Sequence, residues 1–401
     1  MMNKRKEKSM QSDIFKNVSP LGFGIMRLPM DGNTIVESAF KLVEEAVNMG
    51  VNYFDMGYTY QNGYAEEFIG QALVKKYKRS DFYIATKMPL WEVKSEGDLE
   101  RIFQDQLTRL GVDYIDYYLA HMVTKFSWQA MQRFDIKGFF DRKRKEGKIK
   151  HIGFSFHDTP EVLSEIIDDY EWEFCQLQIN FLDWEIRKAK YLYSVATDKG
   201  LPIVVMEPLT GGGLARLSDD CKTIMYEKHP DWSVASWGMR FVGRLRNVAV
   251  VLSGMNASEQ ITDNVGTLFN NPNLNDEEFN VLEKVVKLIS DKNLVPCSTC
   301  GYCLKNCPMN IQIPGLFQAF NEAKTFGTGI FFARHDVVLA TGPREEACIQ
   351  CGKCMNICPQ KIDIPKYMRF FKSMVANRSQ AIQYSISENF NQHISEQETE
   401  M

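Results

Sequence analysis

Two cysteine runs near the C-terminal end constrain the fold more than any other feature of the chain. "CSTCGYCLKNCP", residues 297–308, and "CIQCGKCMNICP", residues 348–359, share the spacing C-x2-C-x2-C-x3-C-P. They hold eight of the ten cysteines, and only Cys175 and Cys221 stand apart. Because the start of the chain lacks the apolar core of a secretory signal, this clustering indicates metal ligation rather than a disulfide framework.

The spacing is typical of bacterial two-cluster ferredoxins, in which the fourth cysteine of each run ligates the other cluster. It therefore predicts two [4Fe-4S] clusters with crossed ligands. The first set is Cys297, Cys300, Cys303 and Cys358, and the second set is Cys348, Cys351, Cys354 and Cys307. Zinc is the alternative, although zinc sites usually take paired C-x2-C units.

The two runs belong to an internal repeat, because they continue as "CPMNIQIP" and "CPQKIDIP". The 40 residues between Cys307 and Cys348 include "PGLFQAFNEAKTF", which has a helical pattern. We expect a small, mainly helical, ferredoxin-like domain over residues 291–370 and a polar tail over 371–401. Nothing in this domain resembles a substrate pocket, so the chemistry has to come from the preceding residues.

Strand and helix patterns alternate through the first 290 residues. Eight apolar, β-rich runs are strand candidates: "LGFGIMRL", "VNYFDM", "FYIATKM", "YIDYYLAH", "IKHIGFSF", "FCQLQINF", "PIVVMEP" and "NVAVVLSG". Helical patterns separate them, at 36–49, 65–77, 97–110, 184–199 and 258–269. This alternation predicts the α/β class and a (β/α)8 TIM barrel over residues 15–290, after a flexible N-terminus of residues 1–14. A doubly wound open sheet is the alternative, but no G-x-G-x-x-G follows the first strand.

Four protonatable side chains stand where three successive strands of such a barrel would end. Asp55 follows the second strand with Tyr60 in its loop, Lys87 follows the third, and His121 follows the fourth. Each has an ordinary structural interpretation by itself: a cap, a packed loop residue, a surface charge and a core histidine. Together they predict a proton-transfer site at the carboxyl face. An ammonium stabilises a nearby phenolate, a carboxylate keeps the lysine charged, and an imidazole can hydrogen-bond a carbonyl.

With these residues in place, the sequence resembles the aldo/keto reductase family over roughly residues 15–290. The resemblance depends on seven segments: "LGFGIMRLP", "NYFDMGYTYQNGYAEEFIGQAL", "IATKMP", "GVDYIDYYLAH", "IKHIGFSF", "VVMEPLTGGGLA" and "SGMNASEQITDN". The whole chain resembles the iron-sulfur branch of that family, with a dicluster domain after the barrel. The resemblance implies that Tyr60 is the general acid/base, that Lys87 and Asp55 tune it, and that His121 positions the carbonyl.

The resemblance also implies a nicotinamide nucleotide at the same face. The implied contacts are Gly24, Met26, Ser155, Gln176, Met206, Pro208, Leu209, Gly211, Gly212, Gly254, Gln260, Asp263 and Asn264.

Four positions depart from the family pattern. Phe156 replaces the usual asparagine beside Ser155, and Met206 replaces a tyrosine that often stacks on the nicotinamide ring. Gly254 and Gln260 stand where the family has the lysine and arginine that bind the 2'-phosphate. Three arginines at 240, 244 and 246 could substitute for them or could simply be solvated. NAD and NADP therefore both remain open.

Composition excludes several classes of partner. The net charge of -4 gives no reason to expect nucleic acid or an anionic membrane. No run approaches the roughly 18 apolar residues that a membrane helix needs, so we expect a cytoplasmic protein. The expected partners are a small-molecule carbonyl or alcohol substrate and, as one option, an electron-transfer protein.

Three functions fit the sequence. The first is a nicotinamide-dependent carbonyl reductase whose clusters stabilise or regulate the C-terminal domain. The second is a ferredoxin-linked oxidoreductase in which clusters supply electrons to the barrel; a flavin is the usual intermediary, because a hydride carries two electrons and a cluster passes one. The third is a nucleotide-sensing or electron-carrier protein without turnover.

Overall fold

The computed structural model describes residues 13–31, 34–270, 273–291, 294–326, 331–332, 335 and 343–378. The chain forms two compact units, one of residues 1–215 and 231–279, here called the barrel unit, and a C-terminal unit of residues 216–230 and 280–401. Residues 1–12 of the predicted N-terminal segment and 379–401 of the predicted tail lie outside the described residues. The domain boundary at residue 290 stays a prediction.

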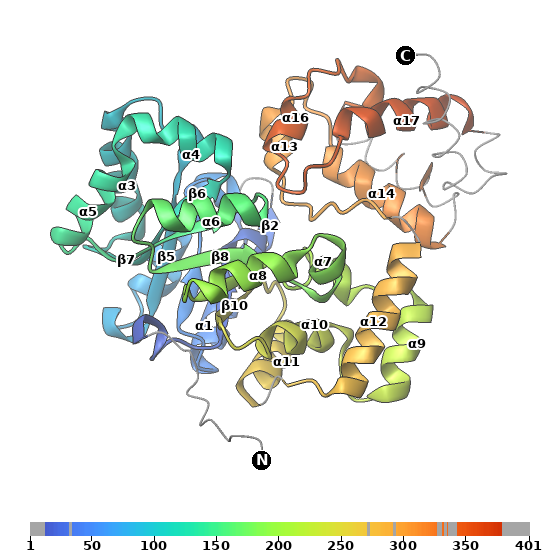
Figure 1. The fold of residues 1–401 in the computed structure, drawn as a ribbon, viewed down its shortest axis with the longest axis horizontal. Helices are drawn as coiled ribbons and strands as arrows, with labels where there is room; N and C mark the ends of the chain where they lie inside the picture. The colour runs from blue at the N-terminus through green and yellow to red at the C-terminus, as the bar shows by residue number, and fades with distance from the viewer. Residues whose placement is uncertain are drawn as a thin grey trace. The chain divides into compact units, whose positions relative to one another are not determined.

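Eight parallel strands close into a barrel, which confirms the predicted fold and shows that the open-sheet alternative is wrong. Around the barrel the order is β1, β10, β9, β8, β7, β6, β5, β4, and β4 pairs back with β1. Figure 1 labels β5, β6, β7, β8 and β10 among these strands. The strands are β1 Leu21–Gly24, β4 Tyr53–Asp55, β5 Tyr83–Pro89, β6 Ile115–Val123, β7 Ile149–Phe156, β8 Phe174–Gln178, β9 Ile203–Met206 and β10 Val248–Ser253. A short hairpin, β2 Met30–Asp31 and β3 Thr34–Ile35, was not predicted.

Helices follow the barrel strands largely as the sequence patterns indicate. They are α1 Ser38–Asn48, α2 Ala65–Ile69, α3 Glu96–Leu110, α4 Lys125–Met131, α5 Ile136–Lys145, α6 Pro160–Asp169, α7 Phe181–Ile186, α8 Ala189–Asp198, α10 Val234–Gly243 and α11 Ser258–Asn270. The predicted helix over 184–199 is instead two helices, because Lys188 has a φ of 58° and the Asn180 side chain caps α7 earlier. The helix predicted over 65–77 continues after α2 as a π-helical turn, Gly70–Val74.

An aromatic cluster fills one part of the barrel interior. Phe15 stacks on Tyr117 with their ring centroids 5.0 Å apart, and Phe174 meets both rings edge-on. The Tyr117 hydroxyl donates a hydrogen bond to the carbonyl oxygen of Ile14. These contacts anchor the first described residues to the barrel strands. They do not involve the polar residues at the carboxyl ends of the strands.

The C-terminal unit is helical in its described parts. Its elements are α9 Asp219–Lys228, most of α12 Asp276–Asp291, α13 Tyr302–Asn306, α14 Ile313–Phe326, η9 Glu345–Ala347, α16 Lys353–Ile357 and α17 Ile364–Ala376. The helix predicted by "PGLFQAFNEAKTF" is therefore present as α14. α17 runs six residues into the segment predicted as a tail, because Phe371 and Met374 lie buried on its apolar side.

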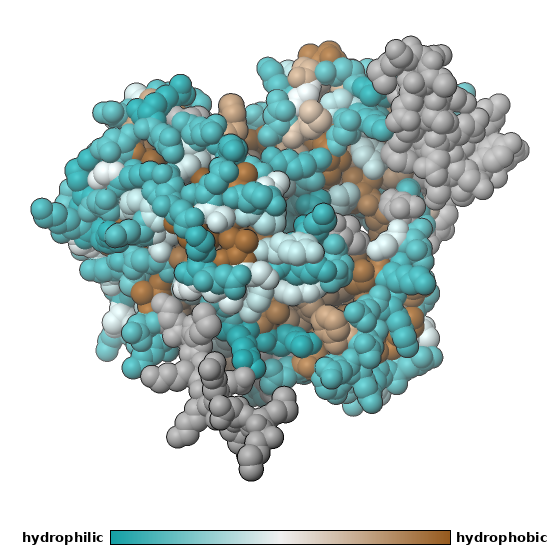
Figure 2. Space-filling model, viewed as in Figure 1, coloured by the Kyte–Doolittle hydropathy of each residue, from teal (hydrophilic) through white to brown (hydrophobic). Residues whose placement is uncertain are grey.

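The surface is mainly hydrophilic over α3, α4 and α5 and over the outward sides of α9 and α12 (Figure 2). Within the described residues, no helix is long and apolar enough to cross a membrane.

Candidate active site and cysteine pockets

The four side chains of the predicted proton-transfer site come together at the carboxyl ends of β4, β5 and β6. Asp55 ends β4, and Tyr60 lies in the short helical turn η3, Tyr60–Gly63, that follows. β5 and β6 extend two residues past Lys87 and His121, so both side chains lie within strands rather than after them. Their residue register places His121 opposite Pro89.

Lys87 and Asp55 form a buried ion pair. Lys87 Nζ lies 2.6 Å from Asp55 Oδ1 and also donates to the Met56 carbonyl oxygen at 2.6 Å. Burial lowers the pKa of Lys87 and raises the pKa of Asp55, because each charge loses its hydration, while the attraction between them opposes both shifts. The second oxygen of Asp55 is buried, and no donor among the described residues reaches it. Lys87 is therefore the group that stabilises the negative charge of the buried Asp55 carboxylate.

Tyr60 lies between this ion pair and His121. Lys87 Nζ is 4.8 Å from the centroid of the Tyr60 ring, and the Tyr60 hydroxyl lies 3.4 Å from His121 Nε2. On its other side His121 contacts the Trp91 ring, with centroids 4.9 Å apart. An imidazole thus lies near the Tyr60 hydroxyl and an ammonium lies near its ring, an arrangement that suits proton transfer to a substrate oxygen.

Two local features fix the position of Tyr60. A Cβ atom added at Gly57 would lie 3.1 Å from the Tyr60 ring and 3.3 Å from His121, so a side chain there would displace them. Gln61 has a φ of 50°, and its amide donates to the carbonyl oxygens of Ile25, Met26 and Leu28 at 3.1–3.3 Å. Gln61 therefore connects the Tyr60 turn to the loop after β1.

The surroundings of His121 favour its neutral form. Burial, and then the charge of Lys87, hold its pKa well below the usual range. Below about pH 6.5, His121 binds a proton in the unfolded chain but stays neutral in the folded chain. Acidification therefore favours unfolding.

We expect the stability of the wild type to fall, from this residue alone, by up to about 1.36 kcal/mol per pH unit below pH 6.5. His121→Asn removes that contribution. The measurement is urea unfolding of both proteins between pH 5 and 7.5. Curves that stay parallel across this range would show that His121 is protonated in the folded protein.

A buried polar network contacts the backbone of Lys87. Glu66 on α2 is fully buried and accepts hydrogen bonds at 2.7 Å from Thr86 Oγ1 and from the amide of Gln106. The same amide donates to the carbonyl oxygen of Lys87 at 3.1 Å, and the Tyr118 hydroxyl donates to Gln106 Oε1 at 2.7 Å. Burial raises the pKa of Glu66. The network holds the β5 backbone at the position from which Lys87 extends.

The residues predicted for the nicotinamide lie at the ends of β7, β8 and β9. Ser155 Oγ accepts a hydrogen bond from the Met122 backbone at 2.8 Å. Gln176 is 2% exposed; its amide nitrogen approaches Met206 Sδ at 3.8 Å, and its Oε1 has no donor among the described residues. Phe156 is buried beside Ser155. A buried amide oxygen without a donor suits the N–H group of a carboxamide, so this end fits a nicotinamide.

The residues predicted for the rest of the nucleotide occupy the loops after β1, β9 and β10. Gly24 ends β1 and Met26 follows it, and Pro208, Leu209, Gly211 and Gly212 follow β9. Arg27 joins the first two loops through a 2.7 Å ion pair with Glu207. A Cβ atom at Gly254 would lie 3.0 Å from the Arg27 side chain. Arg27 therefore occupies the space that a side chain at position 254 would need.

The remaining residues predicted to contact the nucleotide make hydrogen bonds at the start and on the side of α11. Gln260 Oε1 accepts from the Asn256 backbone at 2.9 Å. Asn264 donates to Ser253 Oγ at 3.1 Å, and Asp263 accepts from Ser233 Oγ at 2.6 Å. Of the three arginines considered above, Arg240 packs on the Trp232 ring and Arg244 on the Phe279 ring.

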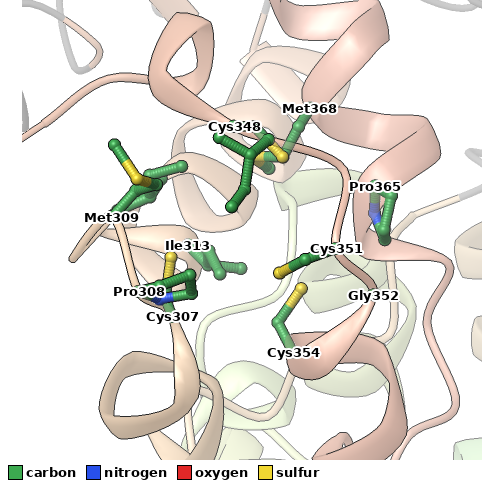
Figure 3. Close-up of a pocket in the computed structure, with 12 residues that line it drawn as sticks. Cys307, Pro308, Met309, Ile313, Cys348, Cys351, Gly352, Cys354, Pro365 and Met368 are labelled. Atoms are coloured by element: carbon green, nitrogen blue, oxygen red, sulfur yellow. The ribbon is translucent and has the colours of Figure 1, made fainter.

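The cysteines of the C-terminal unit surround two pockets. One pocket is lined by the first set with apolar residues around it: Cys297, Cys300, Cys303, Cys358, Ile313, Phe317, Ile362 and Ile364. The other is lined by the second set, again with apolar residues: Cys307, Cys348, Cys351, Cys354, Met309, Ile313, Ile349 and Met368. In Figure 3, Cys307 faces Cys351 and Cys354 across this pocket. Four thiols in an apolar lining are the donor set that a [4Fe-4S] cluster takes.

Several residues of the active site were not identified from the sequence. Gln106 and Trp91 contact the predicted groups or their backbone, Glu66 holds Gln106, and Arg27 and Glu207 join the loops after β1 and β9. One signal was available: Glu66 falls on the apolar side of a short helical pattern, where an acidic residue needs buried partners. The Arg27–Glu207 pair joins positions 180 residues apart, so no local sequence pattern indicated it.

Comparison with known proteins gives two family matches. The Aldo/keto reductase family model matches residues 20–287, and the 4Fe-4S dicluster domain model matches residues 296–362. These two matches agree with the barrel and with the helical unit that carries the cysteine pockets.

Individual relatives are more distant. An uncharacterized oxidoreductase, YqkF of Bacillus subtilis, is 25% identical over 71% of this chain and 97% of its own length. An NADH-specific methylglyoxal reductase of Escherichia coli is 25% identical over 61% of this chain and 86% of its own. Among solved structures, the holo form of aldo-keto reductase AKR11C1 from Bacillus halodurans has a TM-score of 0.56 at 26% identity, over 67% of this chain and 92% of that one.

Proposed function

The chain belongs to the aldo/keto reductase family and is an oxidoreductase with a 4Fe-4S dicluster domain, and on that premise we propose that it reduces a small-molecule carbonyl, or oxidises an alcohol, with Tyr60 as general acid/base. The observation that supports this most directly is the position of the Tyr60 hydroxyl, 3.4 Å from His121 Nε2 and beside the buried Lys87–Asp55 pair. The second reactant is a nicotinamide nucleotide, which supplies a hydride when bound.

In this proposal each side chain has one task. The Tyr60 hydroxyl gives its proton to the oxygen of the carbonyl as negative charge develops there. The Lys87 ammonium stabilises the phenolate that remains, and Asp55 keeps Lys87 charged although it is buried. Neutral His121 hydrogen-bonds the same oxygen and orients the carbonyl. Gln176 Oε1 and Ser155 orient the carboxamide of the nucleotide.

We expect the protein to prefer NADH to NADPH. Gly254 provides no side chain, the Gln260 amide oxygen is used at the start of α11, and the Arg27 charge beside Gly254 is paired with Glu207. A 2'-phosphate therefore gains no free cation from these positions. Gln260→Arg should raise NADPH affinity about tenfold, the effect of one charge-assisted hydrogen bond, and leave NADH affinity nearly unchanged. Nucleotide titrations followed by protein fluorescence would measure both; equal affinities in the wild type would contradict the preference.

In the same proposal the eight cysteines hold two [4Fe-4S] clusters in the crossed sets given above. Each set lines one pocket, and the lining around the thiols is apolar. Such clusters pass single electrons and also supply folding free energy to the unit that holds them.

Anaerobic purification, iron and acid-labile sulfide assays, and an optical spectrum test the proposal. About eight irons are expected, with NADH oxidation when methylglyoxal is supplied as a test carbonyl, and no flavin absorption. Bleaching of the cluster absorption by NADH alone would instead favour a ferredoxin-linked oxidoreductase. Absence of turnover with a panel of aldehydes and ketones would count against the carbonyl reductase.

A further inference from the structure

The two cysteine runs adopt the same backbone conformation, so their residues can be compared one by one. Positive φ angles recur at equivalent positions, 54° at Thr299 and 57° at Gln350, and 79° at Gly301 and 69° at Gly352. Helices α14 and α17 begin at equivalent isoleucines, Ile313 and Ile364. Differences between the copies therefore come from side chains rather than from the path of the chain.

One such difference is a hydrogen-bonded relay in the second copy. The Gln350 amide nitrogen lies 3.3 Å from Cys348 Sγ, and the Arg369 guanidinium donates to Gln350 Oε1 at 2.5 Å. The amide thus directs its N–H at a ligand sulfur of the second set, while a cation polarises its carbonyl end.

The first copy has different side chains at both places. Thr299 stands where the second copy has Gln350, and its hydroxyl donates to the Ser298 carbonyl oxygen at 2.7 Å. Gln318 stands where the second copy has Arg369, and its amide donates to Glu322 Oε1 at 3.0 Å. The two sets also differ in solvent access: Cys351 of the second set is exposed, whereas the cysteines of the first set are buried or half-buried.

We propose that Gln350 and Arg369 make the two clusters unequal, by raising the reduction potential of the cluster held by Cys307, Cys348, Cys351 and Cys354 above that of the other. A hydrogen bond to a ligand sulfur and a nearby cation stabilise the extra negative charge of the reduced form, and solvent exposure acts in the same direction. The inference depends on the proposed crossed sets. It follows that the second-set cluster is the first of the two to be reduced.

Anaerobic titration with dithionite and redox mediators, followed by electron paramagnetic resonance, measures the two potentials. Each cluster takes one electron from dithionite. Gln350→Thr and Arg369→Gln install the residues of the first copy, and Gln350→Glu keeps the contact to Arg369 but removes the N–H donor. Lys372→Gln is the matched control, because it removes an exposed cation three residues further along α17 and leaves both side chains of the relay in place. Cys351→Ser assigns the signals, because it alters the second set alone.

We expect Gln350→Thr and Gln350→Glu to shift the one-electron equilibrium of the second-set cluster about tenfold toward its oxidised form, which is about 59 mV. Arg369→Gln should give a smaller shift in the same direction, and the first-set potential and the Lys372→Gln protein should be unchanged. Equal shifts of both clusters, no shift, or the same shift in Lys372→Gln would overturn the proposal. Iron and sulfide assays on each protein separate these outcomes from failure of the crossed sets, since a wild type without two clusters would refute the cluster assignment itself. If Gln350→Thr fails to load, the nearly isosteric Gln350→Glu decides.

Discussion

Tyr60→Phe should lower kcat for carbonyl reduction by about 10²–10⁴-fold, the range that a positioned proton donor contributes. The ring that lies over Lys87 Nζ at 4.8 Å remains, so only the hydroxyl near His121 Nε2 is removed. NADH affinity and the urea midpoint should stay within error of the wild type, because no nucleotide contact and little buried area change. Steady-state kinetics, together with a fluorescence titration of NADH, checks this.

Tyr58→Phe is the matched control for this variant. Tyr58 lies two residues earlier in the same loop, and its hydroxyl donates to Asp105 at 2.8 Å, outside the proposed site. It should retain nearly full activity. If Tyr60→Phe kept more than a tenth of the wild-type kcat, the proton would have to come from another group, and His121 would be the first to test.

The barrel was predictable because each strand has an apolar sequence pattern that is recognisable by itself. A parallel strand that is covered on both faces reads as a mainly apolar run, as "IDYYLAHMV" does in β6, where all nine residues are buried, Asp116 and His121 included. The ends of these runs placed Asp55 and Lys87 correctly on neighbouring strands. The extent of β5 and β6 was not readable, since pairing beyond Lys87 and His121 depends on partner strands rather than on local pattern.

The supporting contacts were not predictable, for a different physical reason. Glu66, Thr86 and Gln106 are brought together by the packing of α2 and α3 on β5, and none of them has a distinctive sequence neighbourhood. The split between α7 and α8 depends on one residue, Lys188, in the left-handed region, where no glycine or asparagine marked the break. By contrast, the cysteine spacing indicated which four cysteines line each pocket, and that each set ligates a cluster stays a prediction.

Lys87→Met should destabilise the barrel unit by about 3–5 kcal/mol, the cost of leaving one partner of a buried ion pair unpaired. Methionine has nearly the length of the lysine stem, so the loss comes from charge rather than from a cavity. The Asp55 carboxylate, 4% exposed, would lose its only ion-pair partner among the described residues, and its second oxygen already lacks a donor. Urea unfolding and kcat measure the two consequences, because the Tyr60 phenolate also loses its stabilising charge.

The pH dependence and a double variant identify the cause of this loss. Burial already holds the folded pKa of Asp55 above its unfolded value of about 3.9 in the wild type, and Lys87→Met raises it further because the opposing ammonium is lost, so the folded variant takes up a proton first as the pH falls. The stability deficit relative to wild type should therefore be full at pH 7 and shrink toward pH 5. Adding Asp55→Asn removes the buried charge and should restore most of the stability but none of the activity. A deficit that does not change with pH, and that Asp55→Asn fails to relieve, would locate the damage in packing around the methionine instead.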